Sequence, residues 1–90
     1  MRAAAALLVL LAAAPAAAQP TAPQIMRMER EANTRCRGGS GDQPETQKSC
    51  GERDAYARVL NMMNWCFGRR GQVAAAHQWH RCGADSLRAN

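Results

Sequence analysis

Four cysteines, Cys36, Cys50, Cys66 and Cys82, offer the most chemistry in this 90-residue chain. Structural zinc sites bring cysteines together in close C-x2–4-C pairs, and thiol redox catalysis usually uses C-x-x-C. Successive cysteines here are 14, 16 and 16 residues apart, so neither spacing occurs. In an exported chain this pattern predicts two structural disulfides. Four cysteines allow three connectivities. Pairing of neighbours, Cys36–Cys50 with Cys66–Cys82, is the simplest, and Cys36–Cys66 with Cys50–Cys82 is the alternative.

Two histidines are the next candidates for chemistry. His77 and His80 lie i and i+3 in a segment that we expect to be helical, and Met62 and Met63 would suit copper. No carboxylate is placed to orient either imidazole, although metal sites nearly always provide one. His77 and His80 are therefore weak candidate metal ligands, and we expect no cofactor.

The remaining polar residues form no recognisable catalytic set. The sequence has one tyrosine, no serine in a motif with a histidine and no paired carboxylates on a rigid element. Trp65 and Trp79 each lie near a cysteine in the sequence, and we expect each indole to pack over the neighbouring disulfide. The chain is not expected to be an enzyme.

The first eighteen residues predict a secretory signal peptide. Arg2 supplies a positive start, residues 3–14 are all apolar, and Pro15 and three alanines follow. Twelve apolar residues are too few for a membrane span, which needs about 20. We therefore expect a soluble mature protein in the periplasm or outside the cell.

The elements that carry the cysteines and histidines are predicted to be helices joined by glycine-rich turns. Apolar residues recur at helical spacing over residues 24–37, 44–67 and 72–81, and Asp42 is the expected N-cap of the second helix. No segment shows the alternation of apolar and polar residues that is typical of a β-strand. The predicted fold is all-α, a three-helix domain stapled by two disulfides. A signal peptide (1–18), a flexible leader (19–23), a four-cysteine helical domain (24–83) and a polar tail (84–90) make up the chain.

The chain is basic, but its charged residues are dispersed along the sequence. The whole chain carries +5, and apart from Arg69-Arg70 the basic residues alternate with acidic ones. Nucleic-acid binding needs a basic stripe and normally an intracellular location, so no nucleic-acid partner is expected.

Two resemblances accompany these patterns. The run from Cys36 to Cys50, with the later Trp65-Cys66-Phe67-Gly68 and Trp79-His80-Arg81-Cys82, resembles small exported bacterial four-cysteine helical proteins of unassigned function. This resemblance implies export and a helical fold, and it supplies no activity.

A more distant resemblance is to the periplasmic lysozyme-inhibitor domain of LprI type. The residues that carry it are Cys36, Thr46, Cys50 and Leu60. It implies inhibition of a cell-wall-degrading enzyme, and no inhibitory residue is assigned.

The sequence therefore predicts an exported protein-binding module, a monomer or weak oligomer, whose partner is an envelope protein or enzyme. Its alternatives are a lysozyme-type inhibitor and a periplasmic metal-handling protein that uses His77 and His80.

Overall fold

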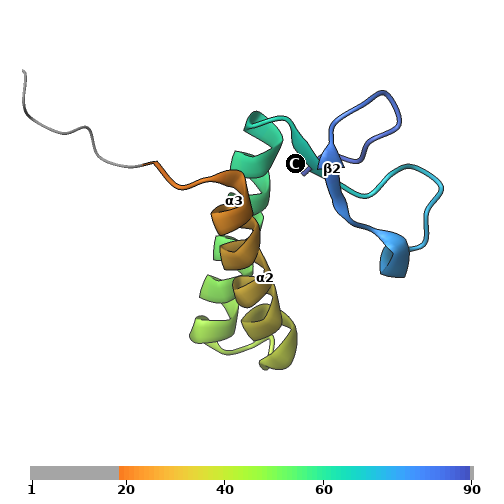
Figure 1. Cartoon of the computed structure of the whole chain (residues 1–90). Helices are drawn as coiled ribbons and strands as arrows, with labels where there is room; N and C mark the ends of the chain where they lie inside the picture. The colour runs from red at the N-terminus through yellow and green to blue at the C-terminus, as the bar shows by residue number, and fades with distance from the viewer. Residues whose placement is uncertain (1–18, 90) are drawn as a thin grey trace, which may run out of the picture.

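The fold combines a helical hairpin with a β-hairpin. The computed structural model describes residues 19–89, so the predicted signal peptide lies outside the described residues. The elements, in chain order, are helix α2 (Ala22–Gly38), helix α3 (Pro44–Met62), strand β1 (Trp65–Phe67), the 3-10 turn η2 (Ala74–Ala76) and strand β2 (Trp79–Arg81). α2 and α3 run side by side, and the β-hairpin projects from the C-terminal end of α3 (Figure 1). The predicted three-helix, all-α fold is wrong, because a two-stranded antiparallel sheet takes the place of the third helix.

Helix α2 starts with a capping box. The Thr21 hydroxyl accepts a hydrogen bond from the backbone N–H of Gln24, and the Gln24 side chain accepts one from the N–H of Thr21. These two bonds satisfy backbone donors that a helix start leaves unpaired, so the helix begins at Ala22 rather than at the predicted residue 24.

Helix α3 has no side-chain cap. Its N-cap is Gln43 and Pro44 occupies the first turn, so the prediction of Asp42 as N-cap is wrong. The Asp42 carboxylate instead accepts a hydrogen bond from the Ser40 hydroxyl, which lowers the pKa of that carboxyl, with help from a backbone hydrogen bond.

The C-terminal end of α3 is set by a left-handed residue. Asn64 has φ of 69°, a conformation that asparagine tolerates better than most residues and that commonly ends a helix. The helix therefore stops at Met62 and does not continue to residue 67 as predicted.

Small side chains let the two helices approach closely. Ala32 of α2 is fully buried, and Thr46 and Ser49 of α3 are each 7% exposed. The Cys36–Cys50 disulfide joins the helices at this end, with the two Cα atoms 4.7 Å apart. The helical pair is therefore held by small residues and a covalent bond as much as by large apolar side chains.

The β-hairpin is short and tied at its base. Trp65 pairs with Arg81, Cys66 with His80, and Phe67 with Trp79. A second disulfide joins Cys66, which is fully buried, to Cys82. The hairpin thus has one face with Cys66 and His80, and another with both tryptophans, Phe67 and Arg81.

Asn61 and the C-terminal segment attach the hairpin to α3. The Asn61 amide donates to the Trp65 carbonyl over 2.8 Å, and its oxygen accepts from the Ala89 N–H over 2.7 Å. The Leu87 N–H donates to the Gly68 carbonyl, and Ser86 forms a β-bridge with Arg69. Residues 85–89, within the predicted polar tail, are thus packed against the hairpin. Neither described helix has the length and apolar character needed to cross a membrane.

Candidate functional site

The cysteines serve the scaffold. Two disulfides are present, as predicted, and they join neighbouring cysteines, so all four thiols are used. The Cys36 sulfur also lies 3.1 Å from Nη1 of Arg53, which links this disulfide to a neighbouring cleft.

The histidines do not form the helical pair that the sequence suggested. His77 follows the short η2 turn and His80 lies in β2, so the i, i+3 helical geometry behind the metal hypothesis is absent. Both ring nitrogens of His80 lie within hydrogen-bond distance of backbone oxygens, 2.8 Å from that of Arg81 and 3.1 Å from that of Gly68. In the described part of the chain, no group of three or more His, Cys, Asp or Glu side chains could hold a metal ion.

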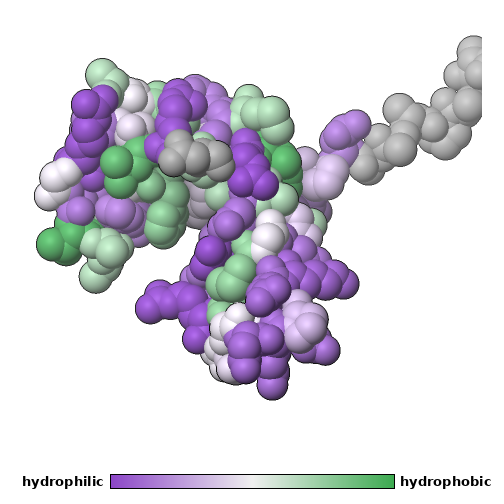
Figure 2. Space-filling view, turned by 180° about the vertical axis from the view of Figure 1, so that it is seen from behind, coloured by the Kyte–Doolittle hydropathy of each residue, from purple (hydrophilic) through white to green (hydrophobic). Residues whose placement is uncertain are grey.

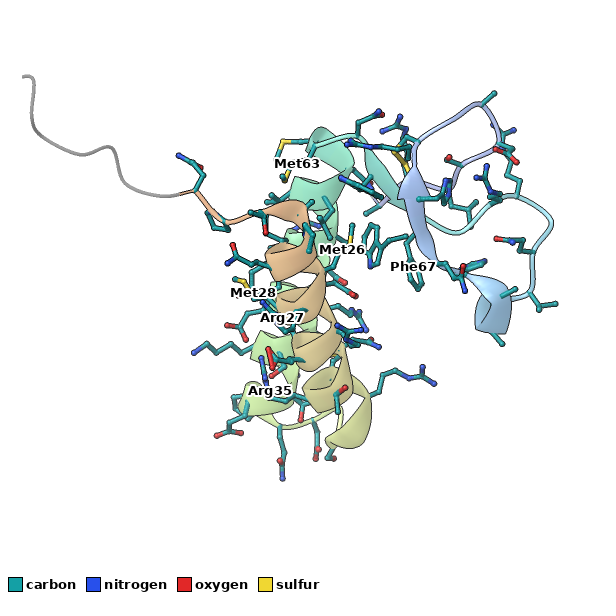
Figure 3. The ribbon with its side chains drawn as sticks, in the orientation of Figure 1. Met26, Arg27, Met28, Arg35, Met63 and Phe67 are labelled. Carbon is teal, nitrogen blue, oxygen red and sulfur yellow. A yellow bond between two sulfur atoms is a disulfide. The ribbon has the colours of Figure 1, made fainter. Side chains whose placement is uncertain are left out.

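A cleft of about 700 Å³ lies between α2 and the β-hairpin. Both helices and the hairpin line it, with apolar, aromatic and charged side chains together. Its principal lining residues are Met26, Glu29, Arg30, Asn33, Arg37, Arg53, Phe67, His77 and Trp79. Figure 3 shows Met26 and Phe67 on facing sides of this space, while Arg27, Met28 and Arg35 lie elsewhere on the helical pair.

Three rings form the hairpin wall of the cleft. The Phe67 ring lies 5.0 Å from that of Trp79 and meets the His77 ring edge-on at 5.8 Å. Phe67 is nevertheless 44% exposed. The other indole, Trp65, lies under the Arg81 guanidinium at 4.3 Å. The Trp79 indole therefore contacts the Phe67 ring and the Trp65 indole contacts the Arg81 guanidinium, while the expected packing of each indole over its neighbouring disulfide stays a prediction.

Glu29 of α2 connects this helix to the hairpin wall of the cleft. Its carboxylate accepts a hydrogen bond from the side chain of Trp79. Partial burial raises the pKa of Glu29 above its usual value, although the Trp79 bond and the nearby Arg53 and Arg30 act in the opposite direction. A raised carboxyl pKa inside a cleft is typical of functional sites.

Arg53 is already engaged, whereas two other arginines face the opening. Arg53 donates to Asp54 over 2.9 Å and to Asn33 over 3.3 Å, so it braces α3 against α2. Arg30 and Arg37 line the cleft from α2, and within residues 19–89 neither side chain has an ion pair or a hydrogen bond. Arg37 and Arg30 therefore present guanidinium groups in the cleft, and Arg30 also lies near the Glu29 carboxylate.

The cleft contains one buried polar atom without a partner. Nε2 of His77 is buried and accepts or donates no hydrogen bond among the described residues. Buried polar atoms are nearly always paired in proteins.

The aromatic and arginine set was not found by sequence reasoning as a site. Trp79 and His77 were assigned to a helix, so their meeting with Phe67 could not be anticipated. The available signal was the Trp-Cys-Phe and Trp-His-Arg pattern, in which large side chains alternate around a central residue as they do in a strand.

A second hollow lies on the outer side of α3. It is shallow and is lined by Ala55, Arg58, Val59, Asn61, Met62, Arg88 and Ala89. Met62 is 79% exposed. From behind, hydrophobic residues are scattered over the hairpin end of the molecule, whereas the lower part of the helical pair is mostly hydrophilic (Figure 2).

Comparison with known proteins yields no relative, since no family model, no curated protein and no solved structure matches the chain. Its function therefore has to be argued from the geometry of the cleft.

Proposed function

We propose that this chain is an exported binding module that recognises a partner polypeptide in the cleft between α2 and the β-hairpin, and that it is not an enzyme. The observation that carries the proposal is Phe67, which is 44% exposed and is backed by Trp79 in a concave site. Aromatic residues and arginine dominate the energetics of protein interfaces, especially in central pockets. Both kinds of residue line this cleft.

The hairpin wall that presents Phe67 is already held in place in the free protein. The Cys66–Cys82 disulfide ties the two strands, and the Trp79 side chain donates to Glu29 across the cleft. A preorganised site loses less conformational entropy on binding. Phe67 therefore suits the role of a rigid anchor.

The proposed compartment is the periplasm or the exterior of the cell. Two disulfides support it, because disulfides persist in oxidising compartments and are rare in the cytosol. N-terminal sequencing or mass spectrometry of the protein from its cell of origin would show a chain beginning at Gln19 if the first eighteen residues are removed.

Inhibition of a cell-wall-degrading enzyme is a narrower form of the same proposal. Its support is the distant resemblance carried by Cys36, Thr46, Cys50 and Leu60. A lysozyme turnover assay with the oxidised protein tests it. Unchanged turnover at micromolar protein contradicts the narrower form and leaves the broader one standing.

The broader proposal is tested with one cleft variant and one matched control. The oxidised chain is used to capture partners from an envelope extract, and each captured protein is purified and titrated against Phe67→Ala and Met62→Ala. Met62 is a suitable control because it is also a large exposed apolar residue, on α3 outside the cleft. Loss of an interface anchor costs more than about 2 kcal/mol, so Phe67→Ala should weaken binding roughly 30-fold. Equal affinities for the two variants would contradict a role for the cleft.

A further inference from the structure

The charge of the cleft is predominantly positive. Three arginines line it, and Glu29 is its only acidic lining residue among those described. Arg53 is paired with Asp54 and Arg30 lies near the Glu29 carboxylate, so three arginines against one lining carboxylate leave the cleft with an excess of positive charge.

The two arginines lie on the same side of α2. They are seven residues apart, which is close to two helical turns and about 10 Å along the helix axis. Three residues of a polyproline II segment make one turn and cover about 9 Å, which is close to this distance. Guanidinium groups bind carboxylates through paired hydrogen bonds with favourable geometry. The spacing therefore matches two carboxylates that lie three residues apart in a segment of polyproline II conformation, where side chains three residues apart point to the same face.

The hairpin wall supplies the apolar part of the same site. Phe67 leaves nearly half of its surface uncovered, and Met26 lies opposite it on α2 (Figure 3). A large apolar side chain placed between them would bury both. The concave shape favours a protruding segment over a flat surface as the occupant.

We propose that the occupant of the cleft is an acidic segment of the partner polypeptide, with two carboxylates about three residues apart and a large apolar side chain beside them. The carboxylates bind Arg30 and Arg37, and the apolar side chain covers Phe67. This inference rests on the proposed function, because it names the class of partner for the same cleft. A second copy of this chain fits less well, because each copy is basic.

The test begins with a random heptapeptide library selected on the oxidised protein. Enriched peptides are synthesised and their affinities measured by the fluorescence of Trp79 in a Trp65→Phe background, since the chain has two tryptophans. The inference predicts enrichment of peptides with paired acidic residues and a large apolar residue. Raising the salt concentration should weaken their binding.

Two double variants isolate the arginine contribution. Arg30→Gln/Arg37→Gln should weaken binding at least about tenfold for each lost carboxylate contact. Arg27→Gln/Arg35→Gln removes the same charge from residues that do not line the cleft, and it should leave the affinity within about twofold. Equal weakening by the two variants, or enrichment of no sequence at all, overturns the inference.

The failure of the inference and the failure of the proposed function are distinguishable. Selection of neutral or basic peptides whose binding is lost in Phe67→Ala overturns the inference and leaves the proposed function standing. Selection of peptides, acidic or not, that bind Phe67→Ala as well as the wild type overturns both. Phe67→Leu, which retains an apolar side chain, serves as the second variant if Phe67→Ala fails to fold, with folding checked by circular dichroism.

Discussion

Gly68 and Gly71 provide a matched pair for testing the packing of the hairpin wall. Both residues have positive φ, 90° and 84° respectively. A Cβ atom at Gly68 would lie 2.6 Å from Cγ of His77, whereas a Cβ atom at Gly71 would meet nothing within 4 Å. Gly68→Ala therefore adds steric overlap to backbone strain, and Gly71→Ala adds backbone strain alone.

The expected losses of stability follow from these two effects. A left-handed conformation costs a residue with a Cβ about 1–2 kcal/mol, and the lower entropy of the unfolded chain offsets about 0.4–1 kcal/mol of this. Gly71→Ala should thus lower the free energy of unfolding by about 0.5–1.5 kcal/mol. Overpacking adds about 1–3 kcal/mol, so Gly68→Ala should lower it by about 2–4 kcal/mol.

Urea unfolding with intact disulfides measures the difference, with tryptophan fluorescence and circular dichroism as parallel probes. The hydrophobic core of so small a domain supplies only about 3–5 kcal/mol, so Gly68→Ala should be close to unfolding. Losses that agree to within about 0.5 kcal/mol for the two variants would refute the packing of His77 against Gly68.

Three further changes test other parts of the structure. Because burial raises the pKa of Glu29, the folded state binds its proton more tightly than the unfolded state, so this carboxyl destabilises the fold as pH rises above about 4. Glu29→Gln should therefore gain stability relative to the wild type between pH 4 and 7 in urea unfolding, and a constant difference would contradict the raised pKa. Asn64→Gly should preserve or increase the thermal midpoint, whereas Asn64→Ala should lose about 1 kcal/mol; equal midpoints would argue against the left-handed residue. Cys66→Ser/Cys82→Ser should cost about 3 kcal/mol and increase hydrogen exchange in residues 65–89 before the helices, and uniform exchange would contradict a separately tied hairpin.

The elements with long, regular patterns were predictable from the sequence. Ile25 and Ala32 share a helical face and are both buried, and Leu60 occupies the expected inner side of the next helix. The two disulfides follow from the even cysteine spacing. These patterns repeat over several helical turns, so the prediction of a helix does not depend on any single residue.

The β-hairpin was missed because its signals are short. Each strand has three residues, so its single alternation of large side chains is too short to be told from a helical pattern, and the three alanines of η2 favour helix. The deciding feature is Asn64, whose left-handed conformation ends α3 and turns the chain into β1. An asparagine has only a weak preference for that conformation in isolation, so the tertiary pairing decides the outcome.

The cleft was missed for the same reason. Trp79 and Phe67 are twelve residues apart, and only the hairpin register places them opposite one another. Arg30 and Arg37 lie seven residues apart in the sequence, but their role depends on which element lies opposite them in the fold. A site formed between two elements can be predicted only after both elements are placed.

The most direct test of the central claim is to map by NMR which residues of the 15N-labelled oxidised chain are affected when the partner binds. The account predicts that NMR shifts on titration concentrate at Met26, Glu29, Phe67 and His77, and at the indole N–H of Trp79. Shifts confined to the α3 hollow around Met62, with the Trp79 indole unchanged, would contradict the claim that this cleft is the binding site.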